Sequence, residues 1–258
     1  MALHQAYPAE QIAEGRHDVG PADVDAEEFV REAAVGDGWL HPRSSNYTFV
    51  VELTCDGRNG YGVYKPERGE SPLRDFPSGT LYRRECAMYE LARILDWGLV
   101  PPTVPREGEV GIGSLQLFVP SADGVNFFTM RDLHRKEMFR MAVLDVIANN
   151  ADRKGGHCLE DKEGHLWGVD HGLTFHTKSK LRTVIWDFAG LPIPDNLMAD
   201  VSKVWNLMCS HDLIEASRLG EFLSEHEVSA LRVRLEGLVE SPSMPEPYSQ
   251  RDVPWPWI

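Results

Sequence analysis

The sequence has no apolar run long enough to cross a membrane, and its first ten residues carry neither the basic start nor the apolar core of a secretory signal peptide. It also has few cysteines. The four, Cys55, Cys86, Cys158 and Cys209, lack the paired spacing of a metal site. We therefore expect a cytoplasmic protein with reduced thiols and no integral membrane segment.

Basic residues are scarce as well. The chain has 26 Lys and Arg against 40 Asp and Glu, which gives a formal net charge of −14. This balance argues against a nucleic-acid partner and against electrostatic docking on an anionic membrane, since both use clustered cations. The remaining composition, 42% hydrophobic and 26% charged over 258 residues, is typical of a globular protein large enough for one domain or two closely packed lobes.

The glycine-rich phosphate loop G-x-G-x-x-G is absent too. In its place, Trp39 to Glu52 predicts a strand, a turn and a second strand. The turn contains Ser44, Ser45 and Asn46, whose hydroxyl groups and backbone amides can donate to phosphate oxygens. A plain hairpin turn is the alternative interpretation.

A second hairpin follows, and its returning strand ends in a lysine. The turn Asp56 to Gly60 is a strong hairpin signal, and the strand after it ends at Lys65 before Pro66 stops the ladder. A lysine at the end of an apolar strand can neutralise nucleotide phosphates. The alternative is a solvated edge residue. The next predicted helix, Leu81 to Trp97, offers Glu85 and Glu90 as acidic partners for this lysine.

The stretch from Asn149 to Phe175 contains the largest group of candidate catalytic and metal-binding residues. It follows an apolar helical run, places Asp152 in a polar loop, and continues as a short hairpin that ends at Asp170. Phosphoryl transfer needs a group that orients the attacking oxygen and hard oxygen ligands for Mg²⁺. Asp152 suits the first role and Asp170 the second. A solvated turn followed by a second turn is the alternative interpretation.

The same loop offers further charged groups. His157, five residues after Asp152, occupies a position suited to a second metal ligand, and a histidine there favours Mn²⁺ over Mg²⁺ or leaves one metal site weak. Arg153 and Lys154 can hold phosphate charge. Arg153 is therefore a candidate catalytic residue beside Asp152 and Lys65.

In their order and spacing, these segments resemble the phosphatidylinositol 3-/4-kinase-like group of the protein-kinase-like fold. The pattern N-A-D-R followed by D-H-G-L resembles type II phosphatidylinositol 4-kinases, where an Asn-Thr-Asp-Arg loop precedes Asp-Asn-Gly-Leu. A closer resemblance, over about residues 40 to 235, is to an actinobacterial family with the same kinase likeness. Two positions depart from the pattern: His157 stands where Asn is usual, and His171 follows the metal aspartate in place of Phe.

The resemblance implies an α+β, bilobal protein-kinase-like fold with ATP between a β-rich first lobe and a helical second lobe. It implies that Glu85, within R-E-x-A-x-Y-x-L, is the partner of Lys65. It also implies that the backbone of Gln116, Leu117, Phe118 and Val119 meets the adenine ring, and that the basic loop 174–183 forms part of a substrate platform.

We expect a disordered leader over 1–24, an N-lobe over 25–120, a C-lobe over 121–240 and a Pro/Trp-rich tail over 241–258. The tail either lies over a groove or serves as a recognition segment. The function expected is ATP-dependent phosphotransfer with Mg²⁺ or Mn²⁺ to a protein or small soluble substrate. Nucleotidyl transfer from the same fold and a nucleotide-binding pseudokinase remain the alternatives.

Overall fold

The computed structural model describes residues 3–4, 8, 12, 15–42, 44, 46–210 and 217–258. In its first half the elements are β1 (Leu3–His4), α2 (Ala26–Glu32), β2 (Ala34–Leu40), β3 (Phe49–Cys55), β4 (Arg58–Pro66), η1 (Glu67–Gly69), α3 (Leu81–Ile94), β5 (Thr103–Gly108) and β6 (Gly111–Leu117). In its second half they are α4 (Phe127–Met130), α5 (Arg135–Ala148), η2 (Gly155–His157), β7 (Cys158–Glu160), β8 (Leu166–Gly168), α6 (Asp195–Cys209), α8 (Leu219–Phe222), α9 (Glu225–Glu240) and η3 (Gln250–Asp252).

The first half builds a six-stranded sheet in the order β1-β2-β3-β4-β6-β5. All neighbours are antiparallel except β1 and β2. The β3–β4 hairpin closes through two residues, Asp56 and Gly57, because Cys55 pairs with Arg58. Both turn residues have positive φ, 51° and 77°, which is the geometry that matches strand twist in a two-residue hairpin. The turn is shorter than the predicted Asp56 to Gly60, because Arg58, Asn59 and Gly60 already belong to β4.

One face of the sheet packs on α2. Phe29 and Val30 of the helix meet Leu53, Tyr64 and Leu115 in a buried apolar cluster. The helix ends at Glu32 and the chain continues as β2, which pairs with β3 at Ala34, Val35 and Gly38 and has a register shift between Val35 and Gly38.

The segment predicted as a disordered leader makes contacts where the structure describes it. Leu3 pairs with Gly38 on β2, and Val19 is buried in the cluster beneath the sheet. Ile12 lies in a third apolar cluster, against Val50 and Tyr61.

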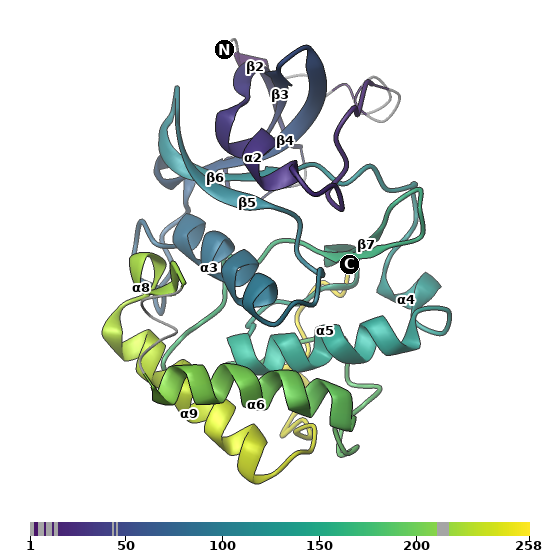
Figure 1. Cartoon of the computed structure of the whole chain (residues 1–258), viewed down its shortest axis with the longest axis vertical. Helices are drawn as coiled ribbons and strands as arrows, with labels where there is room; N and C mark the ends of the chain where they lie inside the picture. The colour runs from purple at the N-terminus through teal and green to yellow at the C-terminus, as the bar shows by residue number, and fades with distance from the viewer. Residues whose placement is uncertain are drawn as a thin grey trace.

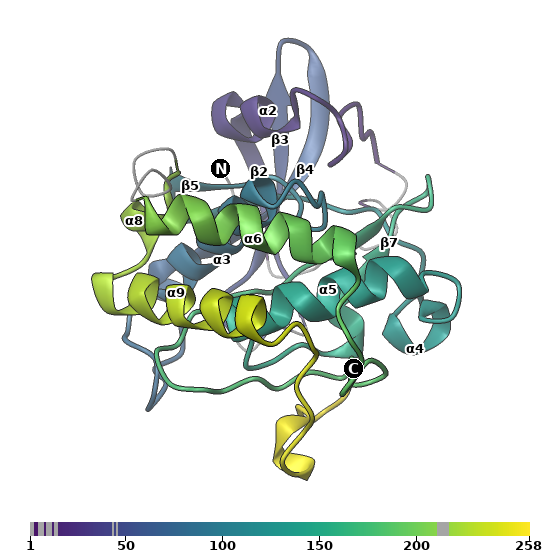
Figure 2. The same cartoon turned by 60° about the horizontal axis from the view of Figure 1, so that its bottom comes forward.

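The second half is helical and holds the larger core. Helices α5, α6 and α9 lie together in the lower part of Figure 1, and the view in Figure 2 shows them as one layer beneath the sheet. Their apolar faces join residues of α3 in one cluster, which includes Met88, Leu144, Val204 and Leu235. The α+β class, with a β-rich first part and helices after it, is thus confirmed. Within the described residues, no helix has the length and apolar character needed to span a bilayer.

The tail after α9 runs back up the molecule, and the C-terminus lies beside β7 (Figure 1). Met244 exchanges backbone hydrogen bonds with Gly190 and Leu191, and the carbonyl of Asp252 accepts from the amide of Thr183. The amide of Gly155 then donates to the carbonyl of Trp257 at 2.6 Å. The sequence pattern of residues 210–219 favours a further helix, but 211–216 lie outside the described residues, and α8 begins at Leu219.

Candidate active site

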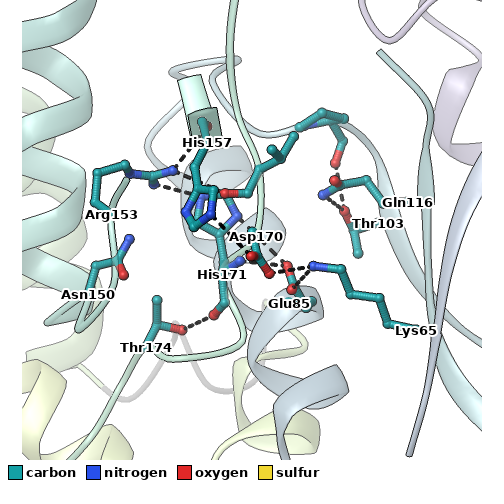
Figure 3. A network of polar contacts seen from close by, with 12 residues as sticks. Lys65, Glu85, Thr103, Gln116, Asn150, Arg153, His157, Asp170, His171 and Thr174 are labelled. Carbon is teal, nitrogen blue, oxygen red and sulfur yellow. Dashed lines mark hydrogen bonds and ion pairs between the residues drawn. The ribbon is translucent and has the colours of Figure 1, made fainter. Parts of the chain in front are cut away.

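The strand lysine and the helix glutamate form an ion pair. Lys65 Nζ lies 2.5 Å from Glu85 Oε1, so the structure joins β4 to α3 through these two side chains (Figure 3). Glu90 instead pairs with Arg93 on its own helix and accepts from the amide of Arg218. Of the two glutamates weighed from the sequence, Glu85 is therefore the one that meets Lys65.

Asp170 joins the same cluster from the second half of the chain. Its Oδ1 lies 2.7 Å from Lys65 Nζ, and its backbone φ is 60°. A non-glycine residue at positive φ costs energy and is concentrated at functional sites. Burial lowers the pKa of Lys65, but the carboxylates of Asp170 and Glu85 outweigh it and raise that pKa. The lysine charge in turn holds the pKa of Asp170 well below its usual range, against the effect of burial.

His157 approaches the other oxygen of Asp170. Its Nε2 lies 3.3 Å from Asp170 Oδ2, while its Nδ1 faces the amide of Lys154 at 3.4 Å. An Nδ1 that accepts from an amide assigns the ring proton to Nε2, which then donates to Asp170. Burial lowers the pKa of His157 to about 4, so the ring is neutral near pH 7.

Asp152 lies on the same loop and forms an ion pair with Lys154. Lys154 Nζ lies 3.0 Å from Asp152 Oδ2, and the side chain of Asn150 fixes the loop by accepting from the Asp152 amide. Burial raises the pKa of Asp152, which the Lys154 ion pair opposes and the nearby Asp170 charge reinforces. A carboxylate with a raised pKa is suited to accept a proton near neutral pH.

Arg153 was predicted to hold phosphate charge, and the structure corrects this. Its side chain is fully buried behind the loop, with the guanidinium 2.8 Å from Asp145 Oδ1 of α5. It also donates to the carbonyl of Val169 and to His171 Nε2. These donors bond to groups inside the protein. Arg153 therefore has a structural role and is not a candidate catalytic residue.

Sequence reasoning missed Asp145 as the partner of Arg153. Asp145 is the only acidic residue of the apolar run Met138–Ala148, and an acid at a buried helical position requires a cation. The sequence therefore contained a sign that Asp145 needs a nearby cation. His171, noted only as a departure from Phe, accepts from Arg153 and donates its amide to Glu85 Oε2 at 2.9 Å. It thereby links the buried pair to the Lys65 cluster.

The turn expected to cover phosphates has other contacts. Ser44 Oγ lies 2.8 Å from Thr48 Oγ1, and Asn46 Oδ1 accepts from the amide of Ser71. Ser45 lies outside the described residues. In the part of the chain that the structure describes, neither Ser44 nor Asn46 is recorded in contact with Lys65, so the turn is not joined to the cluster.

The strand expected to meet adenine is β6 and the residues after it. Gln116 is buried, and its side-chain amide donates to Thr103. The amides of Leu117 and Phe118 donate to the carbonyls of Pro102 and Tyr61, so they are not free for a base. The adenine contact therefore stays a prediction for the backbone carbonyls of this segment and for Val119.

The metal role of this site is compatible with its donors. Asp170 supplies a carboxylate that is 54% exposed. In the tautomer described above, neither nitrogen of His157 has a free lone pair, so this ring would bind a metal only after Nε2 loses its proton and its contact with Asp170. Among the described residues no group of three or more His, Cys, Asp or Glu side chains is placed to hold an ion. A cation such as Mg²⁺ at Asp170 would take its remaining oxygen ligands from substrate phosphates and water.

Comparisons with known proteins come from sequence and from structure. The chain is 40% identical over 248 residues to protein Rv2133c of Mycobacterium tuberculosis, across 83% of this chain and 88% of that protein. It is 30% identical over 158 residues to phosphatidylinositol 4-kinase gamma 4 of rice, across 56% of this chain but only 27% of the rice protein. No family model matches. The crystal structure of the Helicobacter pylori proinflammatory kinase CtkA superposes with a TM-score of 0.48 at 12% identity, over 83% of this chain and 94% of that one.

Proposed function

The chain belongs to the family of the mycobacterial protein Rv2133c, and from the site it carries we propose that it is an ATP-dependent phosphotransferase. The observation that supports this most is the position of one ammonium group. Lys65 Nζ lies within 2.7 Å of carboxylates from two distant parts of the chain, Glu85 on α3 and Asp170 after β8. Phosphoryl transfer in kinase-like sites uses such a lysine, held by a helix glutamate, next to a metal-binding aspartate.

Each residue has a role in this proposal. Lys65 contacts the α- and β-phosphates of ATP, and Glu85 holds Lys65 in place. Asp170 binds Mg²⁺ or Mn²⁺, with His157 beside it. When bound, the metal neutralises charge on the transferring phosphate. In this proposal the adenine ring meets the backbone at Val119.

Asp152 serves as the base in the transfer. The acceptor hydroxyl oxygen forms a bond to the γ-phosphorus, the bond from that phosphorus to the β,γ-bridging oxygen breaks, and ADP leaves. The hydroxyl proton passes to the Asp152 carboxylate. The raised pKa of Asp152 and its position on the loop before β7 support this assignment. The name of the rice relative further supports phosphoryl transfer to a hydroxyl group.

The acceptor in this proposal is a protein or a small soluble molecule. A net charge of −14 disfavours approach to an anionic membrane surface, which a lipid acceptor requires.

The test uses ATP labelled at either the α- or the γ-phosphate, with Mg²⁺ or Mn²⁺ and cell lysate as the source of acceptor. We expect label from the γ-position to reach an acceptor, and Asp152→Asn and Asp170→Asn to abolish this. Transfer of the α-label would show nucleotidyl transfer. Binding of ATP without either transfer would show a pseudokinase.

A further inference from the structure

A large groove lies on the second half of the molecule. Its volume is about 1410 Å³, and its walls are α9, the segment that follows Asp170, and the tail after α9. Pockets for small molecules usually measure about 300–1,000 Å³. A groove of this size, with one wall formed by an extended tail, has room for a chain-like ligand.

The groove opens beside the proposed base. Ala151, the residue before Asp152, lines it, and so does Leu173 from the opposite segment. Arg182, another lining residue, lies close enough for its charge to lower the pKa of Asp152 in part. A ligand in this groove therefore extends toward the group that would take the acceptor proton.

Cations concentrate here in a chain that is otherwise acidic. Four basic residues line the groove: Lys180, Arg182, Arg234 and Arg251. Lys180 is neutralised by Asp75 at 2.6 Å. For the other three, the structure records no carboxylate within ion-pair distance in the part of the chain that it describes.

Arg234 is the most unusual of these. Its Nε donates to the carbonyl of Ile147, its Nη1 faces that of His176, and its Nη2 is buried without a partner among the described residues. Burial without a counter-charge lowers its pKa to about 10. A cation in such surroundings favours an anion in the groove beside it.

Three acidic residues also line the groove: Asp75, Glu246 and Asp252. Against the four basic residues they leave a formal charge of +1. Asp252 also accepts from the amides of Tyr248 and Ser249 at the start of η3 through its Oδ2. Apolar side chains fill the remaining wall, among them Val146, Leu181, Trp186 and Val233. The lining thus combines separated cations with apolar surface.

We propose that this groove binds an extended, acidic polypeptide segment as the phosphoryl acceptor, with the acceptor hydroxyl at Asp152 and acidic side chains at Arg182 and Arg251. This inference rests on the proposed phosphotransferase function. The cations give it charge complementarity, and the apolar wall accommodates the uncharged residues of such a segment.

Binding is tested first, without ATP, by the fluorescence anisotropy of a labelled synthetic peptide of Glu, Leu and one Ser. A matched peptide carries Lys in place of Glu. We expect the acidic peptide to bind at least about tenfold more tightly than the basic one, and an Arg182→Gln/Arg251→Gln variant to lose at least about tenfold of that affinity. Both arginines are exposed, so the variant is expected to fold, which its melting temperature checks. Lys203→Gln makes the same kind of charge change on the exposed face of α6 and should leave the affinity unchanged.

Transfer is tested second, with γ-labelled ATP and the same two peptides, beside vesicles of phosphatidylcholine with phosphatidylinositol. We expect label only on the acidic peptide. Equal binding of both peptides, an unchanged affinity in the double variant, or label on the vesicles alone would overturn the inference. Charge-dependent peptide binding with no transfer under any condition would leave the groove assignment standing and contradict the phosphotransferase proposal instead.

Discussion

Two clusters of opposite charges are linked through His171, and they differ in their access to solvent. In the first, Lys65 joins Glu85 and Asp170, and the Asp170 side chain is 54% exposed. In the second, Arg153 joins Asp145, and both side chains are fully buried. Asp152 lies near enough to the first cluster for the Asp170 charge to raise its pKa, whereas Arg153, the next residue, belongs to the second cluster. The open cluster can exchange partners with a substrate, whereas the buried one has no access to a ligand.

The two clusters should contribute to different properties, the buried one to the stability of the fold and the open one to activity. Breaking a buried ion pair leaves an uncompensated charge away from water, which destabilises the fold. An exposed carboxylate can be neutralised at small cost to stability, because water replaces its contacts. Substitutions in the open cluster should therefore affect activity, and those in the buried cluster should affect folding.

Asp170→Asn tests the open cluster and should have the largest effect. We expect phosphoryl transfer to fall by about 10³-fold, because the amide is a poor metal ligand and no longer balances Lys65. The melting temperature should change little. Asp123→Asn, at an exposed loop position, serves as the control in the same transfer assay. Transfer by Asp170→Asn at the parental rate would contradict the metal assignment.

Arg153→Met tests the buried cluster. It should lower the free energy of unfolding by about 3–5 kcal/mol, because Asp145 is left charged and buried. The double variant Asp145→Leu/Arg153→Met should recover most of this loss, as measured by urea denaturation. If the single variant were as stable as the parent, the buried cluster would not have the role assigned to it.

Glu85→Gln tests the link between the two clusters. Glu85 holds Lys65 through one oxygen and the amide of His171 through the other. Misplacing Lys65 should lower kcat/KM for ATP by about 10²-fold. Glu90→Gln, on the same helix but paired with Arg93, should leave kcat/KM nearly unchanged. If Glu90→Gln lowered kcat/KM more than Glu85→Gln did, the lysine would have a different partner in solution.

The smallest effect concerns pH. Transfer should increase with pH as Asp152 ionises, and burial places this rise above the pH of an ordinary aspartate. Lys154 lowers that pKa, so Lys154→Met should move the acidic limb of the kcat/KM profile to higher pH. The position of the limb is measured, not the plateau, because Lys154 could also contact phosphate. If the acidic limb of Lys154→Met stayed at the parental pH or moved to lower pH, Asp152 would not be the titrating base.

Local patterns in the sequence predicted much of this architecture. The hairpin at Asp56 and Gly57, the strand that carries Lys65 and the hairpin between Asp152 and Asp170 are all present. Two bounds differ, because β4 begins at Arg58, inside the predicted turn, and continues through Pro66, which pairs with Gly113. The choice of Glu85 over Glu90 depended on a family resemblance, since spacing alone left both open.

The misassigned residues depend on contacts between distant segments. Arg153 is adjacent to Asp152 and carries the charge that phosphate requires, so only the fold reveals that it turns inward to α5. The amides of Leu117 and Phe118 are occupied because they donate to the carbonyls of Pro102 and Tyr61, which lie on neighbouring segments of the chain. The cations of the groove come from α9, the tail and the segment after Asp170, which no local pattern brings together.

The most direct test of this division between the clusters is single-turnover transfer from γ-labelled ATP, measured for Asp170→Asn beside the double variant Asp145→Leu/Arg153→Met. We predict that Asp170→Asn transfers almost no label although it remains folded, and that the double variant transfers label at a rate close to that of the parent. Transfer by Asp170→Asn together with an inactive, folded double variant would contradict the account, because the chemistry would then depend on the buried cluster.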